Sequence, residues 1–276
     1  MTATRPELPE PLPVPVVDSH CHLDAAEPIS GVAPAEAIEL AAAVGVTRIV
    51  QVGCNVASSQ WAVAAADRWA PVVASVAMHP NDAARLGAGL PSALTEIEAL
   101  AQHDRVRAVG ETGLDFYRTP DAAGQARQRA SFAAHIAWAK AYDKTLVIHD
   151  RDAHADVLAV LDQHGPPPRI VMHCFSGDFD FARACVERGA YLSFAGPVTF
   201  KNNGSLRSAL AVTPLDRILV ETDAPYLTPM PYRGRPNASY LIPHTARFMA
   251  ETLDVDLAVL CAALNDNAEA AFGGFW

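Results

Sequence analysis

Residues 16–24 read VVDSHCHLD, a short apolar run that ends in two histidines separated by one residue. In a β-strand successive side chains point to opposite faces, so residues two apart share a face. We therefore expect His20 and His22 to point the same way and Cys21 to point the other way. Two imidazoles that converge from one strand form half of a metal site, because neutral imidazole binds Zn and similar divalent ions. Such a pair also arises by chance in loops, so the interpretation depends on the other strands.

Short β-branched runs of the same kind recur along the 276 residues, separated by alanine-rich stretches of helical period. We expect strands over residues 16–19, 47–52, 72–77, 106–110, 145–148, 169–173, 190–194 and 217–221. We expect helices over residues 35–43, 58–69, 91–102, 124–142, 153–163, 178–188, 204–211 and, in two pieces, 242–272. Strands that alternate with helices are typical of a parallel sheet. Eight such units in this length predict an α/β protein with a closed (β/α)8 TIM barrel.

The composition predicts one large folded domain with a short leading segment. Half of the residues are hydrophobic, which is enough to form a large core. Residues 1–15 contain five prolines and cannot form a helix. We therefore expect a Pro-rich, extended N-terminal tail at residues 1–15 and a single barrel domain at residues 16–276.

Charge and cysteine content narrow the range of functions. The five cysteines are odd in number and widely spaced, which argues against a disulfide framework and favours a reducing cytoplasm. We see neither a secretory signal nor an apolar run near the roughly 20 residues that a membrane helix needs. The net charge of −10 argues against binding long nucleic acid through a basic surface. A phosphate substrate at a metal centre stays possible, because the ions supply positive charge. The sequence gives no sign of an obligate protein partner.

Residues that can bind metal follow five of the predicted strands. In a parallel barrel the C-terminal ends of the strands form one mouth, and active sites lie there. The metal-binding side chains at these ends are His20, His22, Glu111, His149, His173 and Asp223. One zinc ion needs fewer ligands, whereas two ions bridged by a carboxylate would use all six.

Strand adjacency predicts how these ligands are divided. The first and eighth strands are neighbours in a closed barrel, so we assign the two histidines of the first strand and Asp223 to one ion. The fifth and sixth strands are also neighbours, so His149 and His173 are assigned to the other, with Glu111 between them as a bridge. Asp223 is in addition the leading candidate for general base, since it could accept the proton of the attacking water. Imidazole ligands favour Zn or Mn over Mg, which prefers oxygen ligands.

Five motifs occur in a fixed order between about residues 16 and 237, namely DSHCHLD, GETGLDFYR, HCFSG, ETDAPYL and PYRGRPN. Together they resemble the TatD family of metal-dependent deoxyribonucleases, which belongs to the amidohydrolase superfamily of barrels. The segment LNDNAEAAF resembles the C-terminal segment of that family. The resemblance implies that the six residues above are metal ligands for two divalent ions and that Zn, Mn or Mg supports activity. It further implies hydrolysis of phosphodiester bonds in DNA or an oligonucleotide, and some members of the family trim from the 3′ end.

Two positions depart from the family pattern. The family commonly has a histidine where Asn81 stands, which leaves His79 as the one imidazole of the segment MHPND. His79 is a candidate for substrate contact, with a structural role as the alternative. The family commonly has a lysine where Arg235 stands, but arginine keeps the charge and can bind phosphate through two hydrogen bonds.

Arginines and aromatic residues near the strand ends are candidates for substrate binding. Four arginines lie just past strand ends: Arg118, Arg151, Arg233 and Arg235. We expect substrate contact from Arg235 and Arg118, and the alternative for each of the four is a solvated loop charge. Phe116 and Tyr117 could stack on a base, or else pack within their loop.

Two other functions compete with the nuclease. The first is a binuclear amidohydrolase that cleaves a C–N or lactone bond. Many such enzymes bridge their metals with a modified lysine at the end of the fourth strand, where this chain has Glu111 and none of its three lysines. The second is a non-catalytic, metal-binding relic of the fold. The complete ligand set speaks against it, because a relic would be expected to have lost at least one ligand.

Overall fold

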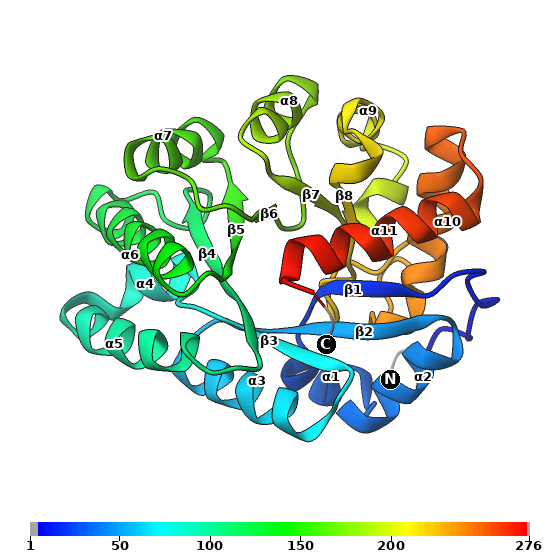
Figure 1. Ribbon diagram of the computed structural model, residues 1–276, viewed down its shortest axis with the longest axis horizontal. Helices are drawn as coiled ribbons and strands as arrows, with labels where there is room; N and C mark the ends of the chain where they lie inside the picture. Colours follow the sequence, from blue (N-terminus) through cyan, green and yellow to red (C-terminus); the bar gives the residue numbers. More distant parts are fainter. Residues whose placement is uncertain (1–4, 275–276) are drawn as a thin grey trace.

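The computed structural model describes residues 5–274, in which eight parallel strands form one sheet in the order β1 to β8 (Figure 1). The strands are β1 (Val16–Cys21), β2 (Val46–Gly53), β3 (Val72–Val76), β4 (Val106–Asp115), β5 (Thr145–Arg151), β6 (Ile170–Met172), β7 (Tyr191–Phe194) and β8 (Ile218–Val220). Each overlaps a predicted strand, so the predicted (β/α)8 TIM barrel is confirmed. Residues 1–4 of the predicted tail and residues 275–276 of the predicted barrel domain lie outside the described range.

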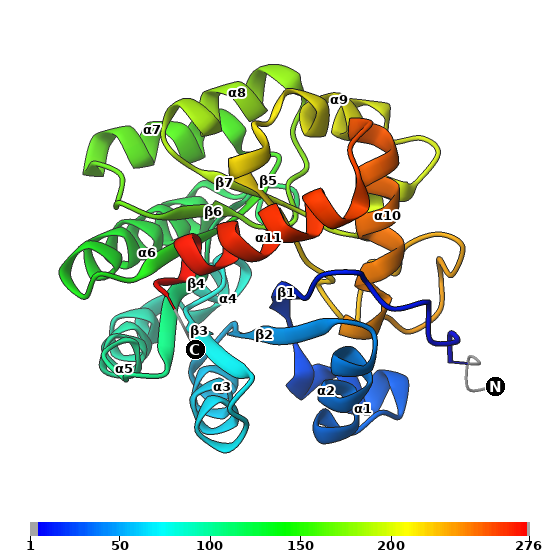
Figure 2. The ribbon, with the colours of Figure 1, turned by 45° about the vertical axis from the view of Figure 1, so that its right-hand side comes forward.

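Helices surround the sheet and follow the strands in chain order (Figures 1 and 2). They are α1 (Leu23–Ser30), α2 (Pro34–Ala43), α3 (Val56–Arg68), α4 (Pro80–Leu86), α5 (Leu90–Ala101), α6 (Ala122–Ala141), α7 (His154–His164), α8 (Phe179–Glu187), α9 (Gly204–Val212), α10 (Ile242–Leu253) and α11 (Leu257–Phe272). The sequence prediction missed α1 and α4. Helix α1 contains Pro28 and has no side-chain cap at its start, and α4 spans only seven residues, so neither has a strong sequence signature.

The seam between β8 and β1 closes the barrel without a continuous ladder of hydrogen bonds. A single bridge pairs Cys21 with Ala224 just beyond the end of β8. The buried carboxylate of Asp18 accepts one hydrogen bond from the Thr222 backbone N–H, at 2.9 Å, and one from the Thr222 hydroxyl, at 2.6 Å. A side chain of β1 therefore ties down the segment that follows β8.

Side chains of the strands alternate between two apolar layers, as expected for a barrel. Val16, Ile49 and their equivalents pack beneath the surrounding helices. Val17, Val50 and their equivalents form a smaller cluster together with residues of α11. This smaller cluster fills the barrel below its mouth.

Helix α11 closes the end of the barrel at which the strands begin, and both ribbon views show it crossing there (Figures 1 and 2). Phe272 is buried in the inner cluster. The hydroxyl of Thr145, the first residue of β5, donates to the Ala271 carbonyl. The Asn267 amide donates at 2.8 Å to the carbonyl of Ile218, the first residue of β8. The opposite end, where the strands finish, is left for the site.

Residues 5–15 contain neither helix nor strand and lie against the barrel. Leu12 is buried, and its N–H donates to the Val44 carbonyl at 3.0 Å. The Arg247 guanidinium donates to the Glu10 carbonyl at 2.8 Å. Within residues 5–274, no helix combines the length and apolar character needed to cross a membrane.

Candidate metal centre

A cavity of about 830 Å³ lies at the end of the barrel where the strands finish. Five of the six predicted metal ligands line it, and the sixth, His20, is buried directly beneath. Histidine His20 is in β1, Glu111 is in β4 and His149 is in β5, while His173 and Asp223 follow β6 and β8. The structure therefore brings together side chains that are up to about two hundred residues apart in the chain.

Glu111 lies at the centre of this group. Its Oε2 is 3.4 Å from the Nε2 of His20. Its Oε1 is 2.6 Å from the Nδ1 of His149 and 3.2 Å from the Nε2 of His173. The two oxygens of one buried carboxylate thus face two different sets of imidazoles, as the predicted bridge requires.

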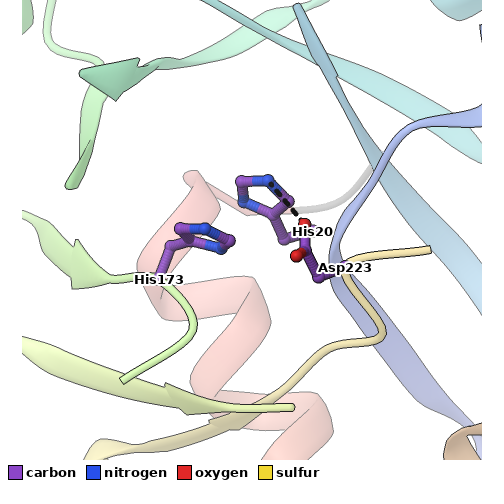
Figure 3. A group of neighbouring side chains, drawn as sticks. All are labelled: His20, His173 and Asp223. Carbon is purple, nitrogen blue, oxygen red and sulfur yellow. Dashed lines mark ion pairs between the residues drawn. The ribbon is translucent and has the colours of Figure 1, made fainter. Parts of the chain in front are cut away.

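The first set of ligands comes from the two sides of the barrel seam. The Nε2 atoms of His20 and His22 are 3.3 Å apart. Asp223 Oδ1 is 3.4 Å from the Nε2 of His22 and 3.8 Å from that of His20. Figure 3 shows the Asp223 carboxylate beside the His20 ring, with the His173 ring stacked on the other side at a centroid distance of 3.6 Å. This stacking also places the second set of ligands next to the first.

Local structure explains why these side chains converge. An irregularity in the pairing of β1 with β2 lies between Asp18 and Cys21, and Cys21 packs in the outer core while the flanking histidines face the cavity side. Asp223 adopts the left-handed φ of 53°. Its N–H donates to the His20 carbonyl at 2.9 Å, and its own carbonyl accepts from the Tyr226 N–H at 2.9 Å. The neighbouring strand and loop thus hold a backbone conformation that is uncommon for this residue type.

The second ring nitrogen of three of these histidines faces an oxygen of a neighbouring residue. His22 Nδ1 lies 3.1 Å from the Val52 carbonyl. His149 Nε2 is 3.4 Å from Asp115 Oδ2, and His173 Nδ1 is 2.9 Å from Glu221 Oε1. Carboxylates and carbonyls in this position fix the orientation of metal-binding imidazoles and make them better ligands. The sequence prediction missed Asp115 and Glu221, although Glu221 stands within the predicted eighth strand.

Two cysteines also line the cavity. Cys54 follows β2, and its thiol donates to Glu111 Oε2 at a distance of 3.8 Å. Cys54 is the second residue past the strand predicted over residues 47–52, so inspection of the two residues after each predicted strand would have identified it. Strand alternation predicts that Cys174, which adjoins His173, faces away from the site into the barrel wall, but this prediction is wrong, because Cys174 lines the cavity. Its φ of 42° breaks the strand alternation on which the expectation rested.

The predicted substrate-binding residues lie at different distances from the centre. His79 Nε2 is 3.3 Å from Glu111 Oε1, so it belongs to the ligand cluster itself. Arg118 lines the cavity wall. Arg235 is not among the residues that line this cavity, and its guanidinium carbon lies 5.4 Å from the centroid of the Tyr232 ring.

The electrostatics of the buried group favour a cation. Burial raises the pKa of Glu111, but the positive charges of His173 and His79 and a hydrogen bond from His149 outweigh it, and the pKa is held well below its usual value. Burial lowers the pKa of His149, but Asp115 and Glu111 raise it to about 9. The buried carboxylates of Asp115 and Glu111 thus stabilise a positive charge at the ring nitrogens of His149.

The donor set fits divalent metal ions. Converging imidazole nitrogens and carboxylate oxygens are the donor atoms that Zn and Mn accept. The Nε2 atoms of His20 and His22 face each other at 3.3 Å, and both cannot carry a proton there. Among the described residues three groups of ligand atoms lie close enough to hold an ion. Glu111 joins His20 and His22 in one group and His79 and His149 in another, and the third consists of His20, His173 and Asp223.

Comparison with known proteins agrees with this geometry. The family model described as TatD related DNase matches residues 17–273. A protein of Mycobacterium tuberculosis described as an uncharacterized metal-dependent hydrolase TatD is 42% identical over 264 residues, which cover 95% of this chain and 99% of that protein. A protein of Cronobacter turicensis described as 3'-5' ssDNA/RNA exonuclease TatD is 36% identical over 246 residues, which cover 86% of this chain and 90% of that protein. The crystal structure of YJJV, a TatD homolog from Escherichia coli, matches with a TM-score of 0.84 and 28% identity, covering 93% of this chain and 97% of that one.

Proposed function

The chain belongs to the TatD family of metal-dependent hydrolases, and from this premise we propose that it is a deoxyribonuclease that hydrolyses phosphodiester bonds of single-stranded DNA. The observation that carries the proposal is the position of Glu111, whose two oxygens lie 3.4 Å from His20 and 2.6 Å from His149. The relative described as a 3'-5' ssDNA/RNA exonuclease supports removal of nucleotides from the 3′ end.

In the proposed arrangement His20, His22 and Asp223 would hold one divalent ion, and His149 and His173 would hold a second, with the Glu111 carboxylate within reach of both sets. Such ions, when bound, polarise the phosphoryl oxygens, lower the pKa of water and balance the charge of the leaving group.

The side chains of the cavity have separate parts in the proposed reaction. Asp223 lines the cavity and can accept the proton of the attacking water on its carboxylate. Arg118 lies on the cavity wall, where its guanidinium can bind a phosphate of the substrate. His79 lies at the edge of the ligand cluster and can contact the phosphate being cleaved. Asp115 and Glu221 hold the His149 and His173 rings in position.

The proposal is tested by hydrolysis of a 5′-labelled single-stranded oligonucleotide with Mn²⁺, Mg²⁺ or Zn²⁺ and with EDTA. We expect cleavage with at least one of the ions, none with EDTA, and a ladder of products shortened from the 3′ end. Glu111→Gln keeps the shape of the side chain but removes its charge, and we expect the rate to fall at least about a hundredfold. Glu98→Gln is the matched control, because Glu98 is on α5 and bonds Tyr142 outside the cavity.

The same preparations should be assayed on a panel of amides and lactones. Turnover of an amide or lactone, with the oligonucleotide untouched, would replace the nuclease by the amidohydrolase alternative. Equal rates for Glu111→Gln and the parent protein would mean that the activity does not come from this centre.

A further inference from the structure

Two arginines stand on one wall of the cavity. Arg118 follows β4 and Arg151 ends β5, and both line the cavity. The ladder between these strands extends to the pair Asp115 and Arg151, beyond the ends of the shorter strands β6 and β8. The two arginines therefore stand on the most extended part of the barrel mouth, a few residues past His149 and Glu111.

Among the described residues neither guanidinium forms an ion pair with a carboxylate, whereas some other arginines of the chain do. Arg188 bonds Asp162 at 2.7 Å, and Arg129 bonds Asp156 at 2.6 Å. Among residues 5–274, no carboxylate forms an ion pair with Arg118 or with Arg151. Two unpaired positive charges on the same cavity wall are unexpected in a chain with a net charge of −10.

Neighbouring groups fix the position of both arginines. The Arg151 guanidinium carbon lies 3.9 Å from the centroid of the Tyr117 ring, which is 61% exposed. The Phe116 N–H donates to the Arg151 carbonyl at 2.9 Å, and the Arg118 N–H donates to Asp115 Oδ1 at 2.8 Å. An arginine stacked on an aromatic ring loses less freedom when it binds an anion, because its plane is already oriented.

Two carboxylates, Asp115 and Asp150, stand close to the arginines, but both face a histidine, and Asp115 Oδ2 is 3.4 Å from the Nε2 of His149. Asp150 lines the same part of the cavity, but its Oδ2 is 2.6 Å from the Nδ1 of His154. Across the cavity, Asp24 and Asp223 contribute negative charge. A substrate with more than one phosphate would therefore extend toward Arg118 and Arg151.

We propose that Arg118 and Arg151 form an anion-binding wall for the phosphate next to the one that is cleaved, and that Tyr117 is a positioning residue for Arg151. The ligand is a phosphodiester of a neighbouring nucleotide, held by charge-assisted hydrogen bonds to the planar guanidinium groups. This inference rests on the proposed function for the identity of the substrate, but the wall itself is independent of the metal ligands.

Binding without catalysis tests the wall directly. Fluorescence anisotropy of a fluorescein-labelled octathymidylate is measured in EDTA at low salt, so that neither metal binding nor hydrolysis contributes. We expect the parent protein to bind and Arg151→Met and Arg118→Met each to bind about tenfold more weakly, with Arg151→Lys in between. Arg68→Met is the matched control, because Arg68 is an exposed arginine stacked on Trp69 and is not on the cavity wall. No binding by the parent protein, or equal binding by Arg151→Met and Arg68→Met, would overturn the inference.

Kinetics with two substrates tests the position of the bound phosphate. Bis(4-nitrophenyl) phosphate has a single phosphodiester and no neighbouring phosphate. We expect Arg151→Met and Tyr117→Leu to raise KM for the oligonucleotide and to leave kcat/KM for the small diester within about twofold. An equal loss with both substrates would place the arginines at the cleaved phosphate and contradict the inference. Failure of the proposed nuclease function has a different result, namely oligonucleotide binding in EDTA without hydrolysis in metal.

Discussion

Glu111 is the residue around which the candidate site is arranged. Its Oε1 faces His149 and His173, and its Oε2 faces His20. An imidazole presents one nitrogen to a metal, whereas a carboxylate can share its two oxygens between two ions. The residue type and its central position therefore favour a paired metal centre over a single ion.

The partners of the ligands should affect metal affinity. Asp115 lies 3.4 Å from the Nε2 of His149, and Asp115→Asn keeps an acceptor there but removes its charge. We expect metal affinity to fall by about 10- to 100-fold, measured by competition with a chelator. Asp162→Asn, which alters only a surface pair with Arg188, serves as the control. Unchanged affinity in Asp115→Asn would show that this carboxylate does not support His149.

His135 should make stability depend on pH. Its Nε2 accepts from the Met78 N–H at 3.0 Å, which requires the neutral ring, and its Nδ1 donates to the Ser131 carbonyl, 2.7 Å away. Burial lowers the pKa of His135 from 6.5 to about 4. Above pH 6.5 the ring is neutral in the folded and unfolded states, whereas between pH 6.5 and 4 only the unfolded state gains the proton. The folded state therefore loses up to about 3 kcal/mol as the pH falls through this range.

His135→Gln removes the titrating group, so its stability should fall less than that of the parent protein on acidification from pH 7 to 4.5. Urea unfolding at the two pH values measures this difference, and the exposed His164→Gln is the control. The same loss of stability in His135→Gln and the parent protein would contradict the account of this side chain.

Single residues show which part of the site was predictable from sequence. The six predicted ligands stand at or just past the ends of the predicted strands, and the rule that parallel strands finish at one mouth was enough to select them. Asp115 was not predictable in this way, because β4 was expected to end at residue 110 and instead continues to Asp115. The spacing of residues along the chain does not predict the role of Glu221 either, since only the folded structure shows that its Oε1 lies 2.9 Å from the Nδ1 of His173.

At the scale of elements, the extension of β4 depends on a glycine. Gly113 adopts a φ of 133°, and a Cβ at this position would lie 2.1 Å from the His149 carbonyl oxygen. A residue with a side chain could not approach β5 so closely. The close approach of β4 to β5 carries Glu111 and His149 to the same place.

Helix α11 should contribute strongly to stability because it fills the base of the barrel. Phe272→Ala leaves a cavity in the inner cluster, and we expect a loss of about 3–5 kcal/mol in the free energy of unfolding. Phe179→Ala makes the same change at a side chain that is 44% exposed, and its loss should be much smaller. Urea unfolding measures both variants, and similar losses would argue against a structural role for α11.

Helices with a clear helical repeat of apolar residues were predicted well, whereas the short helices α1 and α4 were not. Helices such as α3 and α6 are long enough for their alanine-rich pattern to be recognised. Helix α1 begins at Leu23, directly after the predicted metal ligand His22, and contains Pro28, so local signals oppose a helix there. Tertiary contacts, rather than helix propensity, decide its conformation.

At the scale of the whole molecule, the seam between β8 and β1 both stabilises the closed barrel and holds a residue of the candidate site in place. Asp18 on β1 bonds Thr222, and Asp223 is the next residue after Thr222. Thr222→Val removes the hydroxyl donor at 2.6 Å and leaves a buried carboxylate with one partner fewer. We expect a loss of about 1–3 kcal/mol in the free energy of unfolding, measured with urea.

Thr112→Val is the matched control for this change. The Thr112 hydroxyl is also buried, but it has no hydrogen-bond partner among the described residues. If Thr222→Val costs no more than Thr112→Val, the seam does not depend on the bond between Asp18 and Thr222.

The position of the metal ions tests the central claim most directly. Crystals grown with Mn²⁺ or Zn²⁺ give anomalous difference peaks at the bound ions. The account predicts two peaks on either side of the Glu111 carboxylate, one next to His20, His22 and Asp223 and the other next to His149 and His173. A single peak, or peaks away from Glu111, would contradict it.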